Sequence, residues 1–277
     1  MRDFPDSILF VIVLYRQSFE HCKSWISLKA ELKEMKRIVN VLIYDNSPDP
    51  QHIPQENFCK IDYHHDATNP GVGRAYNFGG ELADELGKSW MMLLDQDSEL
   101  TLGALQQYGL AVERNPDSII FAPIVRDIKG ILSPFLFRFG GGRRLQTISS
   151  GMVSLKTHRV INSGMLVSTT AFRNVGGYAD TPMLDFSDIV FLSKLQLQTN
   201  HVVIVNAGLI QNFSGSESQD FQSALERFKI YSQGSKTAGS MLKSESVFWT
   251  RSFLRACQLS VRYQSLAFLM VHFQTRV

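Results

Sequence analysis

The chain has 277 residues, of which 44% are hydrophobic, and it carries 28 Lys and Arg against 26 Asp and Glu. This length can bury a full core, in one domain or in a domain with an appendage. The net charge of +2 argues against nucleic acid as a partner. The odd number of cysteines, the start without a signal-peptide layout and the lack of an apolar run of roughly 18 residues favour a cytoplasmic chain.

Strands that alternate with helices are predicted for the first half of the chain. Residues 8–15, 39–44 and 90–94 are apolar runs, typical of parallel strands buried on both faces. A weaker strand is expected over 59–64 and a further strand over 119–122, and helices are expected over 18–37, about 71–86 and 101–114. This alternation indicates an α/β fold with a mostly parallel sheet, in which ligands lie outside the carboxyl ends of the strands.

The second half begins with a segment that is harder to assign, residues 127–159. Its basic, glycine-rich part, residues 138–144, predicts a mobile loop, either a lid over phosphates or a solvated insertion. Strands are then expected over 161–168 and 201–205, helices over 171–175 and 189–198, and helical periodicity from 219 onward.

Asp95 and Asp97 follow an apolar run of strand length. Two acids at such an exit are costly to bury unless they meet a cation or a strong donor. A carboxylate pair there suits a hard divalent ion such as Mg²⁺, which takes further ligands from a substrate's phosphates. An acidic turn after a core strand is the alternative. Asp45 likewise ends the second strand, where an Asx turn with Asn46 and Ser47 and a role in ligand binding are equally consistent with the residues.

An ordered set of motifs carries a resemblance. The segments are residues 14–15 (LY), 44–47 (YDNS), 69–79 (NPGVGRAYNFG), 93–98 (LLDQDS), 162–167 (NSGMLV), 175–178 (VGGY) and 184–188 (LDFSD). Together they resemble glycosyltransferase family 2, of the inverting GT-A type, and within it the rhamnosyltransferase-like branch of bacterial surface polysaccharide synthesis. The resemblance runs from about residue 8 to about 215.

The resemblance implies a site for a dTDP- or UDP-sugar donor. Asp45 is similar to the acid that hydrogen-bonds the nucleobase, and Tyr15 ends the matching first strand. Gly71, Arg74 and Asn77 match the segment that shelters the nucleotide and its diphosphate.

The paired acids match the family's metal site. Asp97 would hold Mg²⁺ or Mn²⁺ against the diphosphate, with Asp95 near the ribose or a metal-bound water. Many relatives complete the site with a late histidine, for which this chain has Asn212, a weaker ligand.

Asp188 is the candidate general base. In the family an acid at this point removes the proton of the acceptor hydroxyl during a single displacement with inversion. The same position is also typical of a helix N-cap. Asp185 is the fallback, and Lys194 stands where relatives commonly have an arginine, so a planar bidentate contact is lost.

Two regions are expected. A GT-A domain would cover residues 1–218, with a nucleotide half of about 1–125 and an acceptor half of about 126–218. A basic amphipathic helical extension would cover 219–277, where eight Lys and Arg between residues 227 and 277 face one acid, Glu245. Arg251, Arg255 and Arg262 lie within about 40° on a helical wheel. They suit either the cytoplasmic face of the inner membrane, where lipid-linked saccharide acceptors reside, or a helix that covers the core.

Two other functions fit parts of the sequence. A sugar nucleotidyltransferase also has paired acids on an α/β fold, but its glycine-rich loop should follow the first strand, where this chain has Arg16-Gln17-Ser18. A non-catalytic scaffold subunit of a polysaccharide assembly complex is favoured by Lys194 and Asn212 and disfavoured by the intact Asp97 and Asp188.

Overall fold

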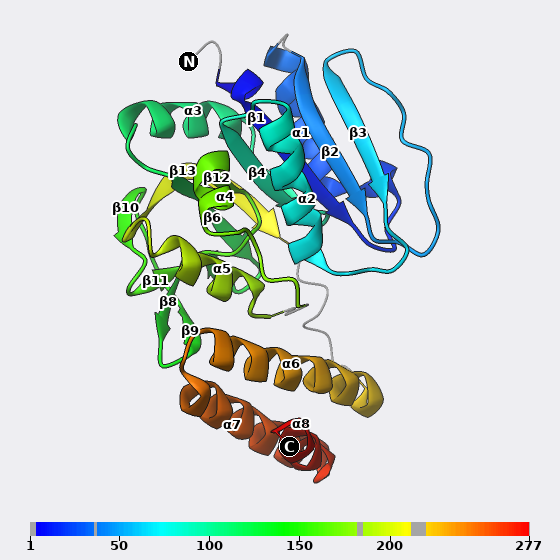
Figure 1. Ribbon diagram of the computed structural model, residues 1–277, viewed down its shortest axis with the longest axis vertical. Helices are drawn as coiled ribbons and strands as arrows, with labels where there is room; N and C mark the ends of the chain where they lie inside the picture. The colour runs from blue at the N-terminus through cyan, green and yellow to red at the C-terminus, as the bar shows by residue number, and fades with distance from the viewer. Residues whose placement is uncertain (1–3, 36–37, 182–184, 212–219, 277) are drawn as a thin grey trace.

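The computed structural model describes residues 4–35, 38–181, 185–211 and 220–276 (Figure 1). A large mixed sheet forms its centre, in the strand order β10-β13-β6-β12-β4-β1-β2-β3, with β5 paired to β13 and β7 paired to β6. Its strands are β1 (Ile8–Leu14), β2 (Val39–Asp45), β3 (Cys59–His65), β4 (Trp90–Asp95), β5 (Ser98–Leu100), β6 (Ile120–Asp127), β7 (Gly130–Ser133), β10 (Gly151–Ser154), β12 (Met165–Ser168) and β13 (His201–Gln211). The expected α/β fold, with a mostly parallel sheet flanked by helices and a helical C-terminal part, is confirmed.

Helices cover both faces of this sheet (Figure 1). They are α1 (Lys23–Met35), α2 (Val72–Glu85), α3 (Ala104–Arg114), α4 (Thr169–Asn174) and α5 (Ser187–Leu195), with short 3₁₀ turns at Pro5–Ser7 and Phe19–His21. Strands β4, β1, β2 and β3 run parallel to one another, and β12 is inserted antiparallel between β4 and β6.

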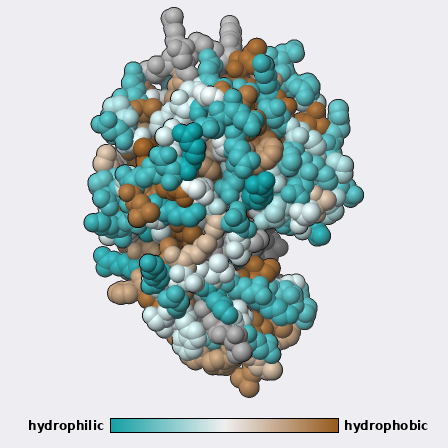
Figure 2. Space-filling view, viewed as in Figure 1, coloured by the Kyte–Doolittle hydropathy of each residue, from teal (hydrophilic) through white to brown (hydrophobic). Residues whose placement is uncertain are grey.

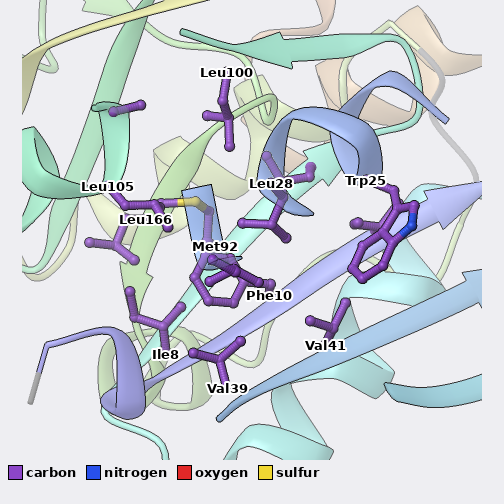
Figure 3. Packing of buried hydrophobic residues seen from close by; sticks show 14 of the residues in the cluster. Ile8, Phe10, Trp25, Leu28, Val39, Val41, Met92, Leu100, Leu105 and Leu166 are labelled. Carbon is purple, nitrogen blue, oxygen red and sulfur yellow. The ribbon is translucent and has the colours of Figure 1, made fainter. Parts of the chain in front are cut away.

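The apolar run of β1 explains why the sheet is covered on both sides. Successive side chains of a strand point to opposite faces. Ile8 and Phe10 therefore pack on one side with residues of α1 and α3, as Figure 3 shows for Leu28 and Leu105. Leu9, Val11 and Val13 pack on the other side with α2, α4 and α5. Each such large side chain contributes about 1.5–3 kcal/mol when fully buried.

The glycine-rich segment, residues 138–144, belongs to a β-hairpin, so the prediction of a loop there was wrong. Strands β8 (Phe135–Arg138) and β9 (Gly141–Arg144) form a second small sheet with β11 (His158–Arg159). Phe139 and Gly140 make the two-residue turn, with φ of 48° and 67°. Positive φ at both residues matches the twist of a tight hairpin.

The last strand is longer than the sequence predicts. The apolar run stops at Val205, but β13 continues to Gln211 through an irregularity between Ile204 and Gly208. Its final residues pair with β5, the short strand that follows Asp97. This extension carries Gln211 to the edge of the sheet where β4 ends.

Three helices form the C-terminal part: α6 (Phe221–Met241), α7 (Glu245–Tyr263) and α8 (Ala267–Arg276). They share a small core that includes Phe228 and Phe268. Phe248 and Ala238 pack against residues 186, 189 and 190 around the start of α5, which joins these helices to the α/β part. The expected boundary at residue 218 lies outside the described residues.

The basic residues of the tail largely contact protein. Arg251 donates to the carbonyl oxygen of Phe139 at 2.7 Å, and the Arg255 guanidinium lies 3.9 Å from the centre of the Tyr231 ring. Figure 2 shows hydrophobic residues at the lower end of the molecule, over these helices. The exposed apolar side chains there include Leu254, Val261, Leu266, Met270 and Phe273. None of the helices in the described part of the chain is both long and apolar enough to cross a membrane.

Candidate functional site

The carboxyl ends of the central strands place Asp45 and Asp95 on either side of β1. Asp45 is paired in register with Leu14, and Asp95 with Val13. Two of the acids named from sequence are thus brought to one edge of the sheet, as the parallel arrangement predicts.

Asp95 is held by hydroxyl groups on both carboxylate oxygens. The Tyr76 hydroxyl donates to Oδ1 at 2.9 Å, and the Ser163 hydroxyl donates to Oδ2. Tyr76 is fully buried, and burial followed by the charge of Asp95 raises its pKa well above the usual value. It therefore stays a proton donor, and Asp95 has a fixed orientation.

Asp97 lies beside Asp95 in a half-buried position. Burial, and then the charge of Asp95, raise the pKa of the Asp97 carboxyl. The side-chain amide of Gln211 donates to Asp97 Oδ1 at 3.1 Å. The amide oxygen of Gln211 is buried and has no hydrogen-bond partner in the described part of the chain.

The two neighbouring acids Asp95 and Asp97 fit a hard divalent cation, which prefers oxygen ligands. A carboxylate repelled by its neighbour gains from a nearby positive charge, and the Gln211 amide oxygen is a second available ligand. Within the described ranges no cluster of three or more His, Cys, Asp or Glu has the geometry to hold a metal ion. Asn212, the third expected ligand, lies outside those ranges.

Asp188 and Asp185 line a cleft of about 450 Å³ together with Asp95. Asp188 lies in the first turn of α5, whose N-cap is Phe186, so capping does not account for this acid. Burial raises the pKa of Asp188 to about 7, and the charges of Asp95 and Asp185 add to the effect. Such a carboxyl is well matched to accepting a proton near neutral pH.

Asn162 also lines the cleft and is hydrogen-bonded to Tyr178. The Tyr178 hydroxyl donates to Asn162 Oδ1 at 2.6 Å, and its ring stacks on Phe191 with 4.2 Å between the ring centres. Burial raises the pKa of Tyr178 well above its usual range. The negative charge of Asp188 acts in the same direction.

Asn77, on α2, is hydrogen-bonded to the backbone of Tyr178. Its amide nitrogen donates to the Tyr178 carbonyl oxygen at 3.1 Å, and its oxygen accepts from the Tyr178 backbone N–H at 2.8 Å. Gly177 makes this approach possible, because a Cβ there would lie 2.3 Å from Asn77 Oδ1. The amide of Asn77 is thus engaged within the protein.

Asp45 is completely buried, and both carboxylate oxygens have protein partners. Oδ1 accepts from the backbone N–H of Ser47 at 2.9 Å, which is the Asx turn named as one alternative from the sequence. Oδ2 accepts from the Gln51 amide at 2.8 Å and from the Tyr63 hydroxyl at 3.0 Å. Its role toward a nucleobase stays a prediction.

The remaining predicted donor-binding residues lie outside the cleft that Asp188 lines. Gly71 is the N-cap of α2 with φ of 92°, a conformation that favours glycine. Arg74 is exposed, forms an ion pair with Glu81 at 3.5 Å, and lines a separate groove of about 310 Å³ with Asn77. The backbone N–H of Tyr15 donates to the Gln96 amide oxygen at 2.8 Å, and its ring is 40% exposed.

Four residues of the site were not predicted from the sequence to be functional. Tyr76 and Ser163 lie inside quoted motifs, so the motifs themselves were a signal for them. Gln211 precedes Asn212, but the predicted strand stopped six residues earlier. Arg227, which lines the cleft from α6, has no local sequence signal.

Comparison with known proteins adds evidence on the fold. Neither a family model nor a curated protein sequence matches the chain. Among solved structures, residues 1–349 of TarS from S. aureus match with a TM-score of 0.54 and 12% identity, over 89% of this chain and 71% of that one. A longer TarS structure matches with a TM-score of 0.54 and 13% identity, over 89% of this chain and 43% of that one.

A third TarS structure, of residues 1–349 in complex with UDP-GlcNAc, matches with a TM-score of 0.51 and 12% identity, over 89% of this chain and 72% of that one. At these identities the comparison shows that the chain shares the fold of the TarS glycosyltransferase.

Proposed function

We propose that the chain is an inverting glycosyltransferase that uses a nucleoside diphosphate sugar. The fold shared with TarS supports a nucleotide-sugar enzyme, and one TarS structure holds UDP-GlcNAc. The convergence of Asp95, Asp185 and Asp188 on one cleft supports a reaction at the carboxyl edge of the sheet.

The main support for the proposal is the position of Asp188 in the cleft, at the start of α5, together with its pKa, which is raised to about 7. Its carboxylate would accept the proton of an acceptor hydroxyl while the hydroxyl oxygen attacks the anomeric carbon from the side opposite the diphosphate. The new C–O bond forms as the bond from the anomeric carbon to the diphosphate oxygen breaks. The proton stays on Asp188, the electron pair leaves with the nucleoside diphosphate, and the configuration inverts.

The surrounding residues would orient this reaction. Tyr76 and Ser163 fix Asp95, and Tyr178 holds the cleft-lining Asn162. Asp97 and the Gln211 amide oxygen would hold Mg²⁺ or Mn²⁺. The ion, when bound, supplies positive charge for the leaving diphosphate.

The resemblance of the sequence motifs to glycosyltransferase family 2 also suggests which donor and acceptor the enzyme uses. It favours rhamnose or another deoxysugar on dTDP or UDP, moved to a lipid-linked saccharide at the cytoplasmic face of the inner membrane. The ligand of the TarS complex makes UDP-GlcNAc the donor to test beside these.

Calorimetric titration of UDP, dTDP and GDP, each with and without Mn²⁺, tests the proposal. We expect one nucleotide to bind more tightly with Mn²⁺, and Asp97→Ala to remove this dependence on the metal. Transfer from the matching sugar nucleotide is then followed by release of the nucleoside diphosphate. The absence of binding for all three nucleotides would contradict the proposal and favour a scaffold subunit.

A further inference from the structure

Arg227 extends from the C-terminal helices into the candidate active site. It lies in the second turn of α6, which runs along the lower end of the α/β part (Figure 1). Its guanidinium lines the cleft that Asp95 and Asp188 line, and Nη2 donates to Asp185 Oδ1. A residue of the helical extension therefore belongs to the same cleft as the candidate base.

The ion pair between Arg227 and Asp185 does not use all the hydrogen-bonding atoms of the two side chains. Arg227 Nη1 and Asp185 Oδ2 are both buried, and neither has a hydrogen-bond partner among the described residues. A guanidinium carries five N–H donors in a planar fork, and a buried donor without an acceptor is unfavourable. Arg227, which lines the cleft, therefore keeps one donor that has no acceptor among the described residues.

The charges around the cleft point to the ligand that would use this donor. Among the described residues that line it, Asp95, Asp185 and Asp188 are acids and Arg227 is the one cation. A diphosphate that entered this space would be repelled by the acids, so it needs positive charge beside it. The guanidinium fork matches two oxygens of a phosphate group, which makes arginine the side chain best suited to this contact.

We infer that Arg227 binds the diphosphate of the donor, exchanging the Asp185 carboxylate for phosphate oxygens when the donor enters. The inference rests on the proposed function and names a ligand for this part of the same site. It also assigns α6 a role in binding. The packing of Phe248 and Ala238 on the start of α5 holds α6 beside the cleft.

A double-mutant cycle separates a phosphate ligand from a structural ion pair. The variants are Arg227→Gln, Asp185→Asn and the double variant. Binding is measured for the nucleoside diphosphate found with the wild type and for the matching nucleoside, which lacks phosphates. We expect Arg227→Gln to weaken nucleoside diphosphate binding about tenfold and to leave nucleoside binding unchanged.

The other two variants decide the interpretation. Asp185→Asn removes the competing carboxylate, so the nucleoside diphosphate should bind at least as tightly as to the wild type, and the double variant should stay weak. A structural ion pair predicts instead that Asp185→Asn weakens binding as Arg227→Gln does and that the double variant recovers. Either that pattern or equal loss of nucleoside binding in Arg227→Gln overturns the inference and leaves the proposed function intact. A wild type that binds none of the nucleotides overturns the proposed function itself.

Discussion

The acids on the two sides of β1 differ in their surroundings. Beside β2, Asp45 is fully buried and its two carboxylate oxygens accept three hydrogen bonds from Ser47, Gln51 and Tyr63. Beside β4, the acids lie close together, the pKa values of Asp97 and Asp188 are raised, and Gln211 and Arg227 keep unpaired polar atoms. Three protein donors on Asp45 indicate an acid that stabilises the fold, whereas crowded acids beside unpaired polar groups fit a site for a ligand.

The largest effect on stability is expected on the β2 side of β1, where Asp45 lies. Asp45→Ala removes three hydrogen bonds and leaves the Gln51 and Tyr63 donors without their acceptor, so we expect a loss of about 3 kcal/mol in the free energy of unfolding. Urea denaturation measures it. A loss below about 1 kcal/mol would mean that Asp45 is not a structural acid.

The raised pKa of Asp188 makes the stability of the protein depend on pH. Its pKa rises from the ordinary 3.8 to about 7 in the folded protein, so the folded state binds more protons than the unfolded state between these values. The contribution of this group therefore lowers stability as pH rises from about 4 to about 7, and levels off above. Asp188→Asn should remove this slope, so the variant should gain stability relative to the wild type as pH rises from about 4 to about 8. Identical pH profiles of wild type and variant would show that the carboxyl has an ordinary pKa.

Two tyrosines, Tyr76 and Tyr44, each donate a hydrogen bond to an acid and can be compared directly. Tyr76 donates to Asp95 at 2.9 Å, and Tyr44 donates to Asp66 at 3.0 Å, each through its hydroxyl. Replacement of either by Phe should cost about 1 kcal/mol of stability. Only Tyr76→Phe should also slow sugar transfer, because only Asp95 lines the cleft. Equal transfer rates for the two variants would remove Tyr76 from the site.

The smallest expected effect concerns the tail arginines. Arg251 donates to backbone oxygens of the β8–β9 turn, whereas the guanidinium of Arg262 lies 5.4 Å from the centre of the Tyr263 ring. Arg251→Ala should lower the thermal midpoint by an amount equivalent to about 1 kcal/mol, and Arg262→Ala by less than about 0.5 kcal/mol. If the two variants melt alike, the contact with the hairpin does not stabilise the protein.

The central fold could be predicted because β1, β2 and β4 are apolar runs long enough for strands buried on both faces. The β8–β9 hairpin was missed because glycines and arginines give no strand pattern, and its turn is held by Arg251, which is distant in sequence. The extension of β13 was missed because Asn206 and Gly208 interrupt the apolar run. In both cases tertiary contacts decide the local structure.

The candidate site was predictable where a residue ends an apolar strand or begins a helix, as Asp95, Asp97 and Asp188 do. The structure brings Asp95 and Asp188 to one cleft, with Asp97 linked to the cleft-lining Gln211. Arg227 and Gln211 could not be named, because the ends of α6 and β13 reach the cleft through packing with distant parts of the chain. The hydrogen bonds that occupy Asp45 and Asn77 also come from side chains and backbone that no local pattern specifies.

The most direct test of the account is Asp188→Asn, measured for both donor binding and sugar transfer. The amide keeps the shape of the side chain and cannot take the acceptor proton. We therefore expect transfer to fall by at least about a hundredfold while the nucleoside diphosphate binds as it does to the wild type. Transfer at the wild-type rate, or loss of nucleotide binding, would contradict the assignment of Asp188 as the base and with it the proposed mechanism.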